Sequence, residues 1–298
     1  MTQSPIAPRM TRRDLVRRAA GGLFAFGISR HAAGAGAASS LDFQAMLRPV
    51  PRTARFEMDG FFVWCGTMAK DDAGRCHLYF SRWPKTTTFR GWVSHSEVGH
   101  AVADSPFGPY RFEAIALKGT GAGTWDRHMI HNPTVLRHGG KYFLYYTGTN
   151  GNANWREGAP LPSDDDYWFC RNNQRIGVAV ADDPAGPWRR FEKPLLDVSV
   201  TGWDTLITTN PSVAATPDGR FLMIYKTASP GEKPAGKVVH GVAFADNPLG
   251  PFKKHPDPIF THATAEFPAE DPYVWHAGDR YCAIVKDKIG RASCRERV

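Results

Sequence analysis

Four short segments of the chain carry the residues best suited to acid–base chemistry. They begin at Asp59, His131-Asn132-Pro133, Thr209-Asn210-Pro211 and Glu270-Asp271-Pro272. Carboxyl groups and imidazoles are the usual general acids and bases of enzymes, and two carboxyl groups in one pocket can divide these roles. These residue types make the four segments candidates for proton-transfer chemistry.

The same segments mark a repeat. Asx-Pro pairs open β-prone hairpins at Pro133, Pro211 and Pro272, at intervals of 78 and 61 residues. A second pattern, Gly followed by Ala-Asp-x-Pro-x-Gly-Pro and an aromatic residue, recurs at Val98–Tyr110, Ile176–Trp188 and His240–Phe252. The two series alternate, so each unit contains a hairpin, a third strand, a turn and a short fourth strand.

This repeat predicts an all-β fold, a β-propeller built from four-stranded antiparallel blades. The units span residues 59–117, 131–196 and 210–259, and a fourth unit begins at residue 270 and stops after two strands. Helical periodicity is not found in these units. The chain is thus expected to hold about three and a half blades of a larger propeller.

The Asx-Pro hairpins and the Ala-Asp-x-Pro-x-Gly-Pro strands resemble the five-bladed β-propeller glycoside hydrolases of family 43 and family 117. The resemblance covers residues 56–288 and implies a propeller that is truncated at its C-terminus. It also implies that the innermost strand of each blade begins at a central funnel. The Asx-Pro heads of the strands would then line a sugar pocket.

The resemblance further implies which residues are catalytic. Asp59 is expected to be the general base, Glu270 the general acid, and Asp271 the neighbour that adjusts the pKa of Glu270. Adjacent residues of a strand point to opposite faces, so only one of Glu270 and Asp271 is expected to project fully into the funnel. Family 117 implies a histidine as an alternative acid, and His131 or His128 would fill that role.

Polar and aromatic side chains near the heads are expected to bind the sugar. The candidates are Trp64, Arg82, His128, His131, Asn132, Asn210, Lys226 and Trp155. Long insertions at residues 81–97 and 149–174 supply some of them, and long loops in compact folds are often functional. By contrast, Trp125-Asp126 and Trp203-Asp204 precede their heads at the same offset, which favours a structural role at the entry of each blade.

Composition narrows the function classes. The formal net charge of +8 is concentrated near the two ends of the chain, so we expect no nucleic-acid partner. Cys65 and Cys76 could form a disulfide or stay as buried thiols, and no spacing typical of a metal site is found. We expect no cofactor. A structural calcium ion, which the family resemblance suggests, has no evident ligand set in the sequence.

The two ends of the chain are expected to lie outside the propeller domain, which we place at residues 41–288. Residues 1–38 resemble a twin-arginine export signal, with Arg12-Arg13 before an apolar run from Ala19 to Ile28. This predicts a periplasmic or secreted protein with no membrane contact once the signal is removed. Residues 289–298 are expected to be non-native read-through, because their back-translation resembles a sequencing adapter.

Three functions remain open at this stage. The leading one is hydrolysis of glycosidic bonds in plant or algal oligosaccharides and polysaccharides. A non-catalytic carbohydrate-binding propeller would explain why two heads carry asparagine. A glycoside phosphorylase would need a basic cluster at the funnel, to which His128, Lys226 and Lys286 could contribute. Neither the sugar, nor the linkage, nor the oligomeric state follows from the sequence.

Overall fold

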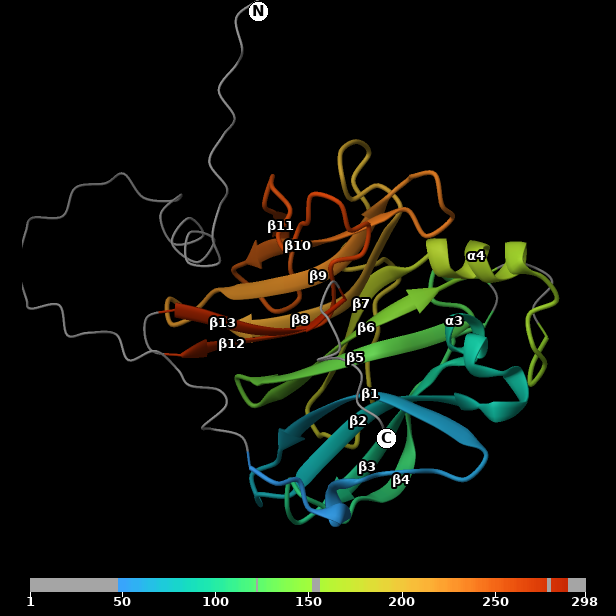
Figure 1. Ribbon diagram of the computed structural model, residues 1–298. Coiled ribbons are helices and arrows are strands. Elements are labelled where there is room, and N and C mark those ends of the chain that lie inside the picture. The colour runs from blue at the N-terminus through green and yellow to red at the C-terminus, as the bar shows by residue number, and fades with distance from the viewer. Residues whose placement is uncertain (1–47, 122, 152–155, 278–279, 289–298) are drawn as a thin grey trace, which may run out of the picture.

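The computed structural model describes residues 48–288 except residues 122, 152–155 and 278–279, and it consists mainly of antiparallel strands (Figure 1). Four sheets follow one another along the chain, in the strand orders β1-β2-β3-β4, β5-β6-β7, β8-β9-β10-β11 and β12-β13. The expected export signal and the expected read-through tail both lie outside the described residues.

The strands of the first two sheets are β1 (Phe61–Lys70), β2 (Cys76–Pro84), β3 (Glu97–Ala103), β4 (Arg111–Leu117), β5 (Met129–His138), β6 (Lys141–Thr149) and β7 (Arg175–Ala181). Those of the other two are β8 (Ile207–Ala215), β9 (Phe221–Ser229), β10 (Lys237–Ala245), β11 (Lys253–Lys254), β12 (Ala269–Ala277) and β13 (Arg280–Asp287). The helical segments are η1 (Arg52–Ala54), η2 (Lys85–Thr87), η3 (Phe89–Gly91), α3 (Trp92–His95) and α4 (Asp164–Asn172).

The all-β class and the repeating antiparallel sheets are as predicted, and we call the sheets blades one to four. Blades one and three have four strands each. In blade two, isolated bridges at Arg189 and Leu196 replace a continuous fourth strand. The first strands β1, β5, β8 and β12 lie side by side in chain order (Figure 1). This arrangement is propeller-like, while a closed ring of five blades stays a prediction.

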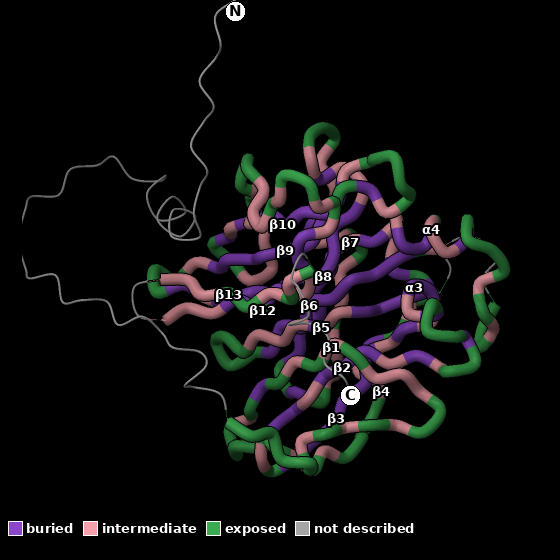
Figure 2. The backbone as a smooth tube through the Cα atoms, viewed as in Figure 1, coloured by how far each residue is buried: buried purple, intermediate pink, exposed green. Residues whose placement is uncertain are grey.

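The core lies between the blades. One cluster joins Tyr145 and Ile176 of blade two to Val213 and Met223 of blade three. Figure 2 shows the buried backbone concentrated in the middle of the molecule, in β6, β8 and β9. Packing of sheet against sheet therefore holds the inner strands beside one another.

All four inner strands are kinked at the same point. A β-bulge occurs there in β1, β5, β8 and β12, and the bulged residues have positive φ angles. They are Cys65 (52°), Asn132 (48°), Asn210 (48°) and Asp271 (50°). Asparagine and aspartate tolerate this backbone region better than most residues. The repeated Asx residue therefore suits the kinked backbone and is also a candidate for chemistry.

Side-chain hydroxyl groups connect one inner strand to the preceding blade. Ser81 of β2 accepts the backbone N–H of Asn132 at 3.0 Å, and Thr147 of β6 accepts that of Asn210 at 3.1 Å. The Thr134 hydroxyl donates to the carbonyl of Pro211 at 2.6 Å. Because neighbouring inner strands belong to different sheets, these hydroxyls replace the ladder that would otherwise pair the backbone groups.

Asp126 is a structural residue of blade two, as the sequence repeat predicted. Its carboxylate accepts the Tyr146 hydroxyl at 2.9 Å and an Arg190 N–H at 3.3 Å, and it is 2% exposed. Trp125 stacks on the Tyr146 ring with centroids 5.7 Å apart.

Asp204 repeats this arrangement in blade three. It accepts the Tyr225 hydroxyl at 3.1 Å and the Lys254 ammonium at 2.6 Å. Trp203 stacks on Tyr225 with centroids 6.4 Å apart. Each aspartate thus ties the entry of its blade to the second strand and to a basic residue that follows the third strand, Arg190 in blade two and Lys254 in blade three. We call the two sets the Trp-Asp clamps.

Asp59 is the counterpart of the clamp aspartates, which corrects its expected place at the head of blade one. It stands six residues before Cys65, as Asp126 stands six residues before Asn132. In blade one, Phe80 occupies the position that Tyr146 occupies in blade two. Because phenylalanine has no hydroxyl group, blade one offers no such donor to Asp59. The residue is exposed in the turn that leads into β1.

The insertion of blade two contains a helix that the sequence did not predict. Ser163 caps α4 by accepting the backbone N–H of Asp166 at 3.1 Å. Asp164, Asp165 and Asp166 form the first helical turn, where the positive end of the helix dipole favours negative charge. The three consecutive acidic residues therefore begin a helix.

We predict that Asp126→Ala and Asp204→Ala each lower the free energy of unfolding by about 2–4 kcal/mol, because each leaves buried hydroxyl and cationic groups without their acceptor. Asp59→Ala is the matched control and should change it by less than about 0.5 kcal/mol, as expected for an exposed site. Urea denaturation checks all three. Equal losses in the three variants would contradict the clamp.

Candidate active site

The four kinked positions bring their side chains together in pairs. Asn132 Nδ2 lies 2.9 Å from Cys65 Sγ, and Asn210 Nδ2 donates to Asp271 Oδ1 at 2.5 Å. The negative charge of Asp271 also acts on the Cys65 thiol, so the first and fourth heads lie close to each other. The heads of the inner strands therefore form one cluster, as the sequence predicted, with Cys65 in place of Asp59.

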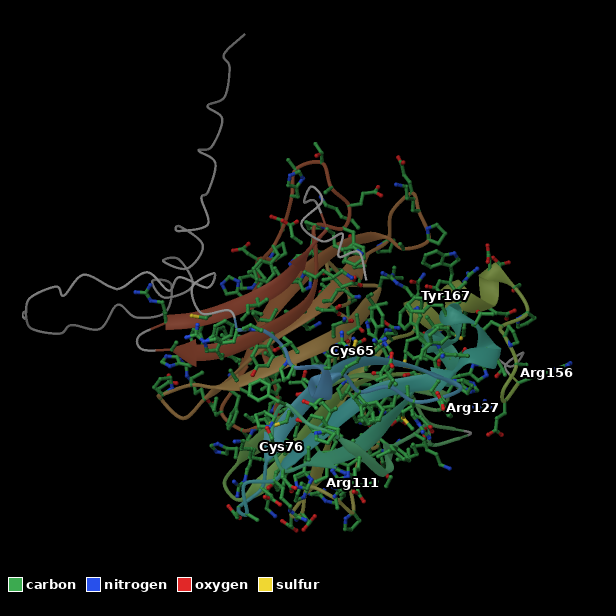
Figure 3. All side chains as sticks on the ribbon, turned by 60° about the horizontal axis from the view of Figure 1, so that its bottom comes forward. Cys65, Cys76, Arg111, Arg127, Arg156 and Tyr167 are labelled. Carbon is green, nitrogen blue, oxygen red and sulfur yellow. The ribbon has the colours of Figure 1, made fainter. Side chains whose placement is uncertain are left out.

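Cys65 lies near the middle of the molecule, and Cys76 lies apart from it, toward one end of blade one (Figure 3). Cys76 faces Lys70 in the β1–β2 register. All four cysteines of the described residues are free, so the disulfide alternative is not realised. Burial raises the pKa of the Cys65 thiol, and the Asp271 carboxylate adds to the effect. The thiol is therefore neutral.

Glu270 is surrounded by lysine side chains. Its carboxylate lies 3.2 Å from Lys226 Nζ, 3.3 Å from Lys288 Nζ and 3.9 Å from Lys286 Nζ. Burial alone would raise the pKa of Glu270, but the Lys226 and Lys288 ammonium groups hold it below its ordinary value. Glu270 is therefore ionised near neutral pH.

Asp271 shows the opposite shift. Burial raises its pKa, and the charge of Glu270 adds to this, against the lowering effects of Lys226 and of the Asn210 hydrogen bond. Two carboxyl groups in different surroundings can divide the roles of acid and base. The shifts favour the protonated form of Asp271 and the ionised form of Glu270, whereas the sequence-based expectation made Glu270 the acid.

His131 is packed into the wall of the cluster. Its Nδ1 lies 2.7 Å from the Ser96 hydroxyl, and its ring contacts Trp92 and Trp83 at centroid distances of 5.2 and 5.6 Å. Burial lowers the pKa of His131 to about 3, and Lys226 adds to the effect. A neutral imidazole fixed by a hydroxyl can hold a ligand by hydrogen bonding.

His240 was not among the residues expected at the site. Neither of its ring nitrogens has a hydrogen-bond partner among the described residues, and the side chain is completely buried. Burial lowers its pKa to about 3, helped by Lys226, with which it pairs across β9 and β10.

Lys226 and His240 break the repeat. Lys226 occupies the second-strand position that Ser81 and Thr147 hold in the other blades. On the third strand, Ser81 pairs with Val98 and Thr147 pairs with Ile176. In blade three the corresponding partner of Lys226 is His240. A lysine has no acceptor, so it cannot bind the next backbone N–H as a hydroxyl does. It donates to Glu270 instead. Lys226 was expected at the site, and alignment of the repeats could also have revealed His240.

Two other expected ligand-binding residues lie in blade one. Trp64, which precedes Cys65, is 44% exposed and meets Phe89 edge to face at 5.6 Å. Arg82 is committed to its own blade, because it pairs with Glu97 at 2.8 Å and lies over Phe61 at 4.3 Å. Trp64 is thus open to contact with a ligand, while Arg82 is engaged elsewhere.

The two remaining expectations concern the insertion of blade two. His128 is 7% exposed and lies beneath the start of the insertion, where a Cβ at Gly151 would come within 2.5 Å of its ring. Trp155 is one of the residues that the structure does not describe. The close approach to Gly151 gives His128 a packing role.

Helix α4 brings two further residues toward the carboxyl pair. The charge of Glu270 acts on both Tyr167 and Arg171. Figure 3 shows Tyr167 on the insertion side of the molecule, and Arg90 lies over its ring at 4.1 Å. Arg171 donates to the carbonyl of Ala235 at 2.8 Å, which links α4 to blade three. Sequence reasoning missed both residues because it expected no helix here.

The residues described contain no group of three or more histidine, cysteine, aspartate or glutamate side chains placed to hold a metal ion. Over the same part of the chain, every helix is too short or too polar to span a membrane.

No protein-family model matches the sequence, and no curated protein matches it. Solved structures are similar to it. One is Zg3597, a family 117 glycoside hydrolase of the marine bacterium Zobellia galactanivorans, with 22% identity, a TM-score of 0.55, and coverage of 80% of this chain and 72% of that chain. Another is described as a glycoside hydrolase, with 20% identity and a TM-score of 0.56.

The second match covers 75% of this chain but 65% of that chain, so the present chain spans slightly less than two thirds of that protein. At these identities the similarity concerns the fold. The resemblance inferred from the repeated motifs is therefore confirmed at that level: the chain has the fold of β-propeller glycoside hydrolases.

We predict that the fold loses stability as the pH falls below the ordinary histidine pKa of about 6.5. His131 and His240 have folded-state pKa values of about 3, so the unfolded chain binds protons that the folded chain does not. Their stabilisation is complete above pH ~6.5 and decreases by about 2 kcal/mol per histidine at pH ~5. Urea denaturation at the two pH values measures this loss.

His240→Leu isolates one of the two groups, since Val98 and Ile176 show that an apolar residue fits this position. The charged groups that act on His240 are Lys226 and Glu270. We expect the variant to lose less stability on acidification than the wild-type protein, while His255→Leu, at an exposed position, keeps the wild-type loss. An unchanged acid response of His240→Leu would contradict the assignment.

Proposed function

We propose that this protein is an exported glycoside hydrolase that acts on plant or algal oligosaccharides or polysaccharides. The observation that carries the proposal is the pair Glu270 and Asp271, whose pKa values are shifted in opposite directions at the head of an inner strand. Glycoside hydrolysis uses two carboxyl groups, of which one donates a proton and the other is ionised. The fold shared with glycoside hydrolases supports the same reading.

In the proposed mechanism, Asp271 is the general acid. Its raised pKa favours the protonated form that can donate to the leaving glycosidic oxygen, and Asn210 fixes its carboxyl group at 2.5 Å. Glu270, kept ionised by Lys226, takes the proton of the attacking water and lowers the energy of positive charge that develops on the sugar ring. Asp59 has no role in this scheme.

The other residues of the cluster would position the sugar. Trp64 offers an exposed aromatic face for stacking on a sugar ring. The Asn132 amide and the neutral His131 imidazole can form hydrogen bonds with hydroxyl groups. Tyr167 and Arg171 of α4 would close the site from the side of the insertion.

A non-catalytic carbohydrate-binding protein is the second candidate. It is favoured by the other three heads, Cys65, Asn132 and Asn210, none of which carries a carboxyl group. This candidate predicts sugar binding that is insensitive to the protonation of Asp271.

We predict that Asp271→Asn and Glu270→Gln each reduce turnover by at least about 100-fold, since each removes a group that transfers a proton. Sugar binding should survive, because the amides keep the shape of the acids. Asp59→Asn is the matched control and should retain wild-type turnover. Release of reducing sugar from a panel of oligosaccharides measures turnover, and calorimetry measures binding. Binding without turnover in the wild-type protein would favour the second candidate.

Export is proposed from residues 1–38 alone. Replacing Arg12-Arg13 with two lysines should retain the full-length protein in the cytoplasm of a bacterial host with twin-arginine transport. Cell fractionation and immunoblotting test this, with the wild-type chain recovered in the periplasm or medium. Equal export of both chains would overturn the proposal without affecting the enzymatic one.

A further inference from the structure

Three lysines converge on a single carboxylate at the proposed site. Lys226, Lys286 and Lys288 all lie within 3.9 Å of Glu270, whose side chain is 20% exposed. We call these three residues the lysine triad. Lys286 and Lys288 are partly open to solvent, with side chains 43% and 33% exposed, whereas Lys226 is 10% exposed. Lys226 is therefore the buried member of the triad, while Lys286 and Lys288 are accessible to solvent.

The strand register explains how the triad forms. Lys286 pairs with Glu270 across β12 and β13, and Lys288, just after the end of β13, donates to the same carboxylate. Lys226 reaches the same carboxylate from β9 of the preceding blade. The Phe267 ring lies beneath the triad, 5.5 Å from Lys226 Nζ and 4.9 Å from Lys288 Nζ.

Positive charge exceeds negative charge at this place. The triad faces Glu270 and Asp271, and burial with the charge of Glu270 favours the neutral form of Asp271. Together the three ammonium groups have nine N–H donors, whereas one carboxylate offers about four acceptor sites. Donors and charge are thus available for a further oxyanion.

The fold itself does not require these cations. At the two other junctions between blades, the position of Lys226 is filled by Ser81 and Thr147, which bind the next strand through a hydroxyl. Packing is therefore possible with small neutral side chains at this position. The cationic set is specific to the junction that carries the carboxyl pair.

We propose that the lysine triad binds an oxyanion carried by the sugar substrate, either the carboxylate of a uronic acid or a sulfate ester. The substrate class is then an acidic oligosaccharide. This inference rests on the sugar site of the proposed function and adds the charge of the substrate. The triad holds the anionic substituent, and the neighbouring Asp271 addresses the glycosidic oxygen.

Binding of matched oligosaccharides to the full-length protein tests this proposal. Calorimetry compares oligogalacturonates and sulfated galactan oligosaccharides with their neutral counterparts of equal length, at low and high salt. We expect the acidic sugars to bind at least about 10-fold more tightly at low salt, as charge-assisted hydrogen bonds allow. The preference should decrease at high salt, because the lysines are partly exposed.

The double variant Lys286→Gln/Lys288→Gln should lose about 10-fold of the affinity for acidic sugars and leave neutral-sugar affinity unchanged. Lys253→Gln, which removes one exposed charge on β11, is the matched control and should bind like the wild-type protein. Thermal unfolding confirms that the partly exposed substitutions leave the fold intact. Equal affinity for acidic and neutral sugars, or an unaltered preference in the double variant, would overturn the proposal.

A separate arm adds inorganic phosphate. If the triad binds phosphate as a co-substrate, phosphate alone will bind with an affinity similar to that of the acidic sugars, and it will increase the turnover of neutral sugars. This result would reject an oxyanion carried by the sugar. Because binding is measured independently of turnover, acidic-sugar binding without hydrolysis would overturn the proposed activity and leave this inference standing. Hydrolysis of neutral sugars with no preference for acidic ones would support the proposed activity and overturn this inference.

Discussion

The kink at the head of each inner strand is the constraint on which the rest of the structure depends. Neighbouring inner strands belong to different sheets, so a backbone N–H at the kink cannot be paired by an ordinary ladder. Ser81 and Thr147 supply the missing acceptor from the preceding blade. The same positive φ that creates this need favours asparagine or aspartate, and so gathers polar side chains at the centre of the molecule.

The junction between blades three and four departs from this rule, and the departure creates the candidate site. Lys226 donates to Glu270 where a hydroxyl would have accepted a backbone N–H. The Ser212 hydroxyl still accepts the N–H of Val274 at 2.9 Å, so the two inner strands remain connected further along. Because this bond holds the strands together, the head position is free to carry charge.

Much of the fold could be predicted from the sequence, because the repeat encodes close contacts. Gly99 and Gly241 occupy one position of the repeat, and a Cβ there would come within 2.5 Å of Phe80 and 2.4 Å of Tyr225 respectively. Such positions tolerate no other residue, so glycine recurs there and makes the repeat visible in the sequence. Asp59 was misplaced because blade one has neither the tryptophan nor the tyrosine of the clamps, and its head residue, Cys65, is not an Asx.

The site could be predicted less well, because its electrostatics arise from residues distant in the sequence. Residue types alone present Glu270 and Asp271 as similar acids. Lys226 and Lys288 form hydrogen bonds with Glu270, whereas burial and the charge of Glu270 raise the pKa of Asp271. Lys226 lies 44 residues before Glu270 and meets it only when blades three and four pack together. The kink then separates the two carboxyl groups, with Asp271 bonded to Asn210 and Glu270 left among the lysines. Blade packing therefore shifts the pKa values of the two acids in opposite directions, and the same packing makes the surroundings of the pair cationic.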